Sequence, residues 1–173
     1  MVAWKSAFCR LSDIIDIKVL SSSFIDDDKS EFVRIRMYRI ETDTFTLDLS
    51  PEIYEQDFVY PVNVNLGVRI SSYGYSADTY MDVGVRGIAE FALRLKDLYE
   101  TLSGEARLEE PYGVHNYIEF VADTGGHIRV LGRLNNKCAF GYTQEINFEN
   151  EIDQTYLSNF VNRLLADYVR YAE

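Results

Sequence analysis

The sequence has few of the side chains that bind metals or form cross-links. Its 173 residues include two cysteines and two histidines, and neither cysteine lies in a Cys-x-x-Cys pair. Disulfide frameworks and zinc sites need several such residues at close spacing, so we expect neither, and no cofactor is predicted. Cys138 falls in an apolar strand pattern, which indicates a buried and inert thiol.

Long apolar runs are also missing. No stretch approaches the roughly 20 apolar residues that a transmembrane helix needs. The first residues read MVAWKSAFCRLSDIID, and they lack the apolar core of a signal peptide because Lys5, Arg10 and Asp13 interrupt them. The sequence therefore predicts a cytoplasmic protein that has no membrane partner.

Basic residues are scarce compared with acidic ones. Lys and Arg together number 17 and Asp and Glu 28, which gives a formal net charge of -11 at pH 7. A small basic stripe, Arg34, Arg36 and Arg39, is expected to pair with acids on neighbouring strands such as Asp48. Nucleic acid and anionic membranes repel an acidic surface, so the charge argues against both as direct partners. It favours a basic protein partner, although solubility alone is a sufficient reason for an acidic protein.

Alternation of apolar and polar residues dominates the first half of the chain. In PVNVNLGVRI, residues 61–70, apolar residues alternate with polar residues or glycine. A period of two predicts strands with one buried and one wet face, as in antiparallel sheets. By this criterion strands are expected near residues 13–20, 31–37, 44–49, 62–70, 75–85, 105–109, 114–123, 127–134 and 138–148.

Two segments change to helical spacing. Apolar residues recur every three to four positions from Ile88 to Leu102, and again from Tyr156 to Val169. Each pattern predicts an amphipathic helix that packs on a sheet. Ser103-Gly104 is expected to end the first helix, and the Asp153 carboxylate is suited to cap the second.

Together these patterns predict a single α+β domain over residues 1–173. It is an antiparallel, β-rich domain of about eight to nine strands with two amphipathic helices. The expected order is about five strands, a helix, three or four strands and a second helix. A chain of 173 residues buries about 70% of its unfolded surface, so it needs no disulfide or metal to fold.

Motifs for catalysis are absent from the sequence. It contains no Gly-x-Gly-x-x-Gly, no Gly-x-x-x-x-Gly-Lys and no Gly-x-Ser-x-Gly. His115 and His127 sit beside the same predicted hairpin and could face each other across it, but two histidines alone make a poor metal site. We therefore expect a protein that is not an enzyme.

The segment QEINFENEIDQTYL, residues 144–157, carries four acids and no base. Asp153 is accounted for as the helix cap, because a helix needs only an acid or two near its start. Glu145, Glu149 and Glu151 exceed that need, and we predict that they form part of a surface facing a basic protein partner. The alternative is a solvated loop that leads into the cap.

The C-terminal half of the chain resembles a known family. An amphipathic helix ends in LSGEARLEEPY, a hairpin carries GHIRVLGRL, and a last strand leads to DQTYLSNFVNRLL. This order resembles the WapI-like family of small bacterial immunity proteins over roughly residues 85–166. The resemblance implies a non-enzymatic protein that neutralises a toxin domain, typically one that degrades tRNA. It supplies no catalytic residue to transfer.

The resemblance agrees with the charge of the chain. Toxic nucleases must be basic to hold phosphates, and an acidic inhibitor gains association rate from the opposite charge. Three other functions stay open. They are a dimeric acidic chaperone for a secreted effector, a small-ligand-binding protein with a pocket between sheet and helices, and a structural domain of unknown partner.

Overall fold

The computed structural model describes residues 36–54, 61–137 and 141–172. Within these ranges, eight strands and two α-helices follow in the order of four strands, a helix, four strands and a helix. Both sheets are antiparallel, so the predicted α+β architecture is confirmed. The strand predicted near residues 13–20, Arg34 and Cys138 lie outside the described residues. That residues 1–173 form a single domain stays a prediction.

The first sheet contains four strands in the order β1-β2-β3-β4. They are β1 (Tyr38–Glu41), β2 (Phe45–Ile53), β3 (Val64–Ser72) and β4 (Tyr75–Val83). The alternation of the sequence determines the two faces of this sheet. Val64, Leu66, Val68 and Ile70 of β3 are buried, because alternate side chains of a strand point to the same side.

The first described strand begins later than the sequence predicts. The alternation over residues 31–37 predicts a strand with Met37 on the inward face, opposite Arg34 and Arg36, but β1 begins at Tyr38 and Met37 is 41% exposed. The reason lies in tertiary contacts. The buried Tyr38 ring packs 6.0 Å from the Tyr168 ring, centroid to centroid, and its hydroxyl donates a 2.6 Å hydrogen bond to Asp167. The inward assignment of Met37 is therefore wrong.

The second sheet has the order β5-β6-β7-β8. Its strands are β5 (Glu105–Glu109), β6 (Tyr117–Ala122), β7 (His127–Lys137) and β8 (Thr143–Asp153). The turn predicted at Thr124–Gly126 joins β6 to β7. Gly125 and Gly126 have φ angles of 81° and 85° there, a backbone conformation that favours glycine.

The last strand is shifted along the chain relative to the prediction. The sequence predicts a strand over residues 138–148, whereas β8 extends from Thr143 to Asp153. Asn150 explains why the predicted strand ended too early, because it places a polar residue where the alternation requires a buried one. Its Oδ1 atom accepts a 2.9 Å hydrogen bond from the Ser72 hydroxyl, so the amide oxygen is buried with a partner, whereas the Nδ2 atom has none among the described residues.

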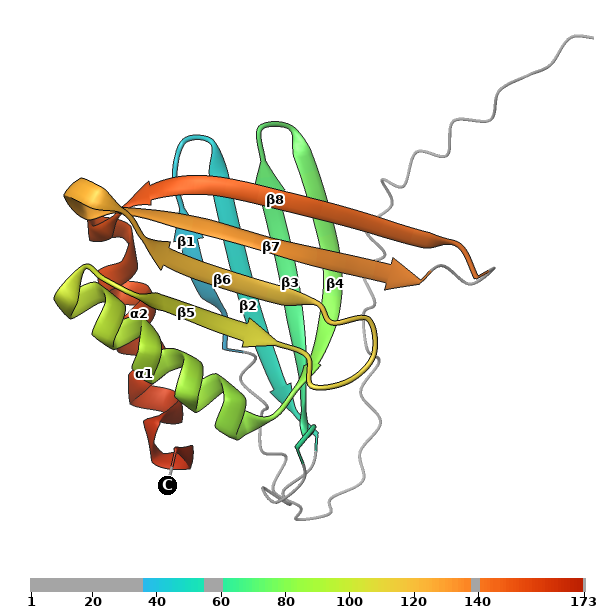
Figure 1. Ribbon diagram of the computed structural model, residues 1–173. Coiled ribbons are helices and arrows are strands. Elements are labelled where there is room, and N and C mark those ends of the chain that lie inside the picture. Colours follow the sequence, from blue (N-terminus) through green and yellow to red (C-terminus); the bar gives the residue numbers. More distant parts are fainter. Residues whose placement is uncertain (1–35, 55–60, 138–140, 173) are drawn as a thin grey trace, which may run out of the picture. The chain divides into compact units, whose positions relative to one another are not determined.

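Both predicted helices are present. They are α1 (Val85–Thr101) and α2 (Leu157–Tyr168), and α2 is flanked by the short 3-10 turns η2 (Gln154–Tyr156) and η3 (Val169–Tyr171). The first helix ends slightly earlier than predicted, because Leu102 already has a left-handed backbone with φ 50°. The helices lie side by side, with α1 also against β5 and α2 also against β1 (Figure 1).

Aromatic side chains join these elements into one apolar core among the described residues. The Phe91 ring on α1 lies 5.9 Å from the Phe120 ring on β6, and Phe120 lies 6.1 Å from Phe160 on α2, measured between centroids. Phe45 on β2 lies 6.4 Å from Phe148 on β8 and so connects the two sheets. The strands of the second sheet run across those of the first (Figure 1).

Candidate partner-binding surface

The three glutamates singled out in the sequence lie on one face of one strand. Glu145, Glu149 and Glu151 occupy odd positions of β8, and the buried Phe148 and Ile152 occupy even positions. The glutamates therefore point away from the core, on the outer face of the second sheet. All three are exposed, and we call them the β8 acidic strip. The sequence identified these residues but did not place all three on one strand, because the predicted strand ended at residue 148.

Each glutamate of the strip has a polar neighbour. Glu149 accepts a 3.0 Å hydrogen bond from the Nη1 atom of Arg129, and the Glu151 carboxylate lies 3.1 Å from the Nδ1 atom of His127. Glu145 accepts a 2.8 Å hydrogen bond from the side-chain amide of Asn147. The side chains of Glu149 and Glu151 are both 61% exposed, and exposed ion pairs contribute only about 0–1 kcal/mol each. The carboxylates thus stay accessible to a partner.

Two other arginines on this face of the sheet are held by neighbours within the sheet. Arg107 lies 2.8 Å from Glu109 and 3.3 Å from Glu119, and its guanidinium stacks 3.7 Å above the centre of the Tyr117 ring. Arg133 donates a 3.0 Å hydrogen bond to the backbone carbonyl of Val114. The guanidinium groups of Arg107 and Arg133 are therefore bound by neighbouring residues of the protein. The β8 acidic strip lies at the β8 edge of the same sheet.

Asp153 at the end of β8 has the capping role predicted for it. Its Oδ1 atom accepts a 2.9 Å hydrogen bond from the backbone N–H of Thr155, in the 3-10 turn that leads into α2. This hydrogen bond lowers the pKa of the Asp153 carboxyl below its usual range, and the nearby His127 acts in the same direction. Asp153 thus belongs to the start of the helix rather than to the strip.

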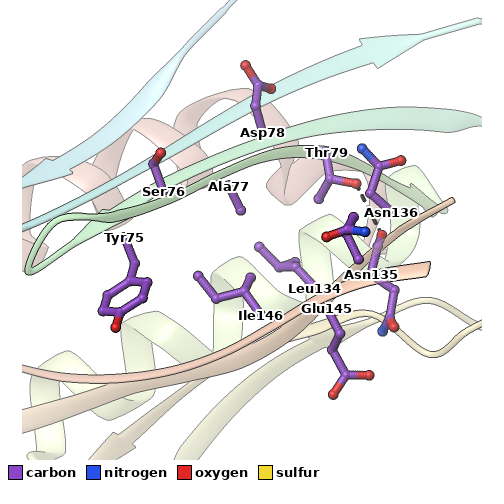
Figure 2. Close-up of a pocket in the computed structure, with 11 residues that line it drawn as sticks. Tyr75, Ser76, Ala77, Asp78, Thr79, Leu134, Asn135, Asn136, Glu145 and Ile146 are labelled. Carbon is purple, nitrogen blue, oxygen red and sulfur yellow. Dashed lines mark hydrogen bonds between the residues drawn. The ribbon is translucent and has the colours of Figure 1, made fainter. Parts of the chain in front are cut away.

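A cavity of about 400 Å³ lies between the two sheets. Tyr75, Ala77 and Thr79 of β4 line one side of it, and Leu134 of β7 and Ile146 of β8 line the other (Figure 2). Each of these five side chains is uncharged, and the lining also includes the polar residues Asn135, Asn136 and Gln144. The sequence placed a possible ligand pocket between sheet and helices, and this cavity lies elsewhere. A smaller hollow of about 290 Å³ does lie between a helix and a sheet, with Phe91 of α1 and Leu108 of β5 in its lining.

Cavity and acidic strip are adjacent at the start of β8. In Figure 2, Ile146 points toward the space between the sheets, whereas Glu145 beside it points away. On β4, Asp78 likewise points away from the cavity and lies 2.8 Å from Arg69 in an ion pair. One strand, β8, therefore presents a charged face outward and an uncharged face toward the cavity.

The two histidines do not face each other. β6 and β7 pair Tyr117 with Arg133 and Ala122 with Ile128, so His115 and His127 lie at opposite ends of this hairpin. The interpretation that placed them across from each other is wrong. It did not specify the register of the β6–β7 pairing, which the turn sets. Among the described residues, no group of three His, Cys, Asp or Glu side chains is placed to hold a metal ion.

The outer face of the first sheet carries a row of alternating charges. Arg39 donates hydrogen bonds of 2.6 and 2.8 Å to Asp48 on the neighbouring strand, as the sequence predicts for this pair. Asp48 also lies opposite Arg69 in the register, and Arg69 pairs with Asp78. Arg36 forms an ion pair with Asp167 near the C-terminus instead of a cross-strand pair.

The sequence gives no sign of a buried polar cluster that connects the sheets. Glu110 is 7% exposed and accepts hydrogen bonds from the backbone N–H groups of Asp82 and Asn116, both at 3.1 Å. Asn116 in turn accepts a 2.7 Å hydrogen bond from the backbone N–H of Asn135. The cluster fixes the β5–β6 loop against β4 and β7, next to the cavity.

The comparison with protein families decides the identity of the chain. The sequence model of the immunity protein WapI-like family matches residues 24–172. The chain belongs to this family. Comparisons with curated proteins and with solved structures give no match.

The family match extends well beyond the residues that carried the resemblance. It includes the whole first sheet as well as the second sheet and both helices, so both sheets of this WapI-like protein belong to the family domain. Immunity proteins act on a toxin partner and generally are not enzymes. Neither described helix has the length and apolarity that a membrane crossing requires.

Proposed function

We propose that this WapI-like protein is a non-enzymatic immunity protein that neutralises a basic, nuclease-type toxin domain by binding it. The observation that carries the proposal is the β8 acidic strip, three exposed carboxylates on one face of one strand. In this proposal the strip forms part of the surface that contacts the toxin. The cytoplasm is the proposed place of action, because nucleic acid substrates of such a toxin are found there.

Charge complementarity supports this choice of partner. A nuclease needs a positive surface to hold phosphates, and the chain has a net charge of -11. Opposite charges steer the two proteins together and raise the association rate by about 10-fold or more. The strip is held in place by a β-strand, so its backbone loses little conformational freedom when the strip binds.

The proposal is tested with a basic toxin domain encoded beside the gene for this chain. Cells that express the toxin domain alone should stop growing, and co-expression of the full chain should restore growth. The purified proteins should form a complex whose formation slows at high salt. Loss of protection together with absence of a complex would refute the proposal.

The main alternative, a chaperone for a secreted effector, gives a different result in the same experiment. Such a chaperone is expected to be a dimer, to bind its partner without blocking its enzymatic activity, and to be needed for secretion. Light scattering on the purified chain and a nuclease assay on the complex distinguish the two functions. A complex that keeps full nuclease activity would favour the chaperone.

A further inference from the structure

β8 forms an open edge of the second sheet. The sheet order ends at β8, and no described strand pairs with its other side. At eleven residues it is far longer than the four-residue β1 or the five-residue β5, which form edges beside the helices. Backbone N–H and C=O groups along a free edge are available for pairing with another strand.

Among the described residues, this edge has only part of the usual protection against strand pairing. Proteins commonly blunt an edge with proline, charged side chains such as lysine, bulges or short strands. The β8 sequence TQEINFENEID contains no proline and no lysine, and its eleven residues pair with β7 in one unbroken register without a bulge. Its outward charges are all acidic, so the edge is open to a partner of suitable charge.

Acidic outward residues select against a second copy of the chain. If two β8 strands paired edge to edge with their faces aligned, Glu145, Glu149 and Glu151 would lie among the same acids of the other copy. Like charges directly opposite each other destabilise a strand pair. A strand with basic side chains on that face would instead form cross-strand ion pairs.

The cavity lies on the opposite face of the same strand. Side chains of an added strand alternate between the two faces of a sheet, as those of β8 do. One set would lie beside the β8 acidic strip, and the other beside Ile146 and the cavity with Tyr75 and Ala77. A volume of about 400 Å³ lies within the range of about 300–1,000 Å³ that is common for ligand sites.

We infer that the partner binds by adding an extended segment to the free edge of β8, with basic side chains facing the acidic strip and apolar side chains entering the cavity. In such binding, main-chain hydrogen bonds supply affinity and the pocket for alternate side chains supplies specificity. This inference rests on the proposed function, and it adds the form and the alternating chemistry of the bound segment.

The first test uses synthetic peptides and the wild-type chain labelled with ¹⁵N. One peptide of about seven residues, the length of an ordinary strand, alternates lysine and valine. A second peptide has the same composition with its lysines and valines in two separate blocks. The third control is the alternating peptide with N-methyl groups on every second residue. It is made in two versions, one for each set of alternate residues. The alternating peptide should bind and slow amide exchange along β8.

The block peptide should bind about tenfold more weakly, because it cannot place lysines beside the acidic strip and valines beside the cavity along its whole length. At least one N-methylated peptide should lose binding, because it cannot form the main-chain hydrogen bonds. Equal binding of all the peptides would overturn the inference, since charge alone would then explain the interaction. Amide protection that is confined to other strands would overturn it as well.

A second test fills the cavity. Ala77→Phe places a ring in the space opposite Ile146. Ser76→Phe is the matched control, because Ser76 borders the cavity but its side chain points to the other face of β4 (Figure 2). Ala77→Phe should weaken binding of the alternating peptide about tenfold or more, the size expected for losing one anchor side chain. Ser76→Phe should bind as the wild type does, and equal binding of both variants would contradict the inference.

The same variants separate this inference from the proposed function. If a toxin domain is neutralised and Ala77→Phe neutralises it equally well, the immunity function stands and strand addition at β8 is wrong. If no toxin domain is neutralised but the alternating peptide protects β8, the edge binds an extended basic segment and the immunity function fails. Thermal unfolding of both variants shows whether each one is folded at the temperature of the assay.

Discussion

Phe160 on α2 and Phe120 on β6 pack against each other in the core, with their ring centroids 6.1 Å apart. Both side chains are at most 1% exposed. We expect Phe160→Asp to cost several kcal/mol in the free energy of unfolding, about the penalty for burying an unpaired charge. Chemical denaturation measures this loss.

The matched control for that change is Asn162→Asp, which adds the same charge on the exposed side of α2. It should change the free energy of unfolding by no more than about 0.5 kcal/mol, as surface substitutions usually do. Near-wild-type stability of Phe160→Asp would mean that α2 packs loosely against the second sheet.

The buried Glu110 provides a prediction about the connection between the sheets. Glu110→Ala leaves the backbone N–H groups of Asp82 and Asn116 without their acceptor, which should cost about 1–3 kcal/mol for each group that stays unsatisfied. Glu110→Gln keeps one carbonyl oxygen and should cost less. Glu109→Ala is the control, because Glu109 is more exposed and pairs only with surface groups.

Regular alternation made most of the fold predictable. β3 contains an unbroken alternation of apolar residues with polar residues or glycine from Val64 to Ser71, and β4 a similar repeat that Thr79 interrupts. Both helices, α1 and α2, contain apolar stripes at helical spacing, so local sequence decides the type of these elements. The predicted strand bounds were wrong near two residues whose burial depends on a partner distant in the sequence. Tyr38 is held by Asp167, and Asn150 is buried because Ser72 supplies its hydrogen bond.

The site was predictable in composition but not in arrangement. The sequence identified Glu145, Glu149 and Glu151 as surplus acids, but the strand that it predicted ended at residue 148, before two of them. Only the pairing of β8 with β7 places them on one face of one strand. The cavity and the Glu110 cluster depend on β4 lying against β7, a contact between residues distant in the chain that no local pattern encodes.

The capping carboxylate leads to a pH-dependent prediction. Because the pKa of Asp153 is lowered in the folded state, its contribution to stability is fully present above its unfolded pKa of about 3.9 and is lost as pH falls through the folded pKa. Asp153→Ala should therefore lower the melting temperature at neutral pH, and this difference should shrink as the pH falls below the unfolded pKa of about 3.9. A difference that is constant with pH would contradict capping by the ionised form.

The metal-free interpretation has a direct test. EDTA should leave the melting temperature unchanged, and His115→Ala and His127→Ala should both keep the protective activity of the wild type. His127 lies near Glu151 at the surface, and an exposed pair of this kind contributes about 0–1 kcal/mol. A large drop in melting temperature on chelation would show that the protein needs a metal ion.

The β8 acidic strip gives the prediction closest to function. Changing Glu145, Glu149 and Glu151 together to lysine should leave the fold nearly unchanged, because all three are exposed and their surface pairs are weak. Association with a basic toxin domain should slow by about 10-fold or more at low salt. The advantage of the wild type should shrink as salt screens the charges. Stopped-flow association kinetics across a salt series measures both effects.

A control with the same change in net charge decides whether the position of the acids matters. Glu52, Glu90 and Asp97 are exposed and lie on β2 and α1, so changing them to lysine alters the total charge equally without touching β8. If the strip contacts the partner, this control should slow association much less than the β8 triple variant, because nearby charges act most strongly within about 10 Å. Equal slowing by the two triple variants would assign the effect to net charge alone, and equal rates for the β8 variant and the wild type would remove the strip from the binding surface.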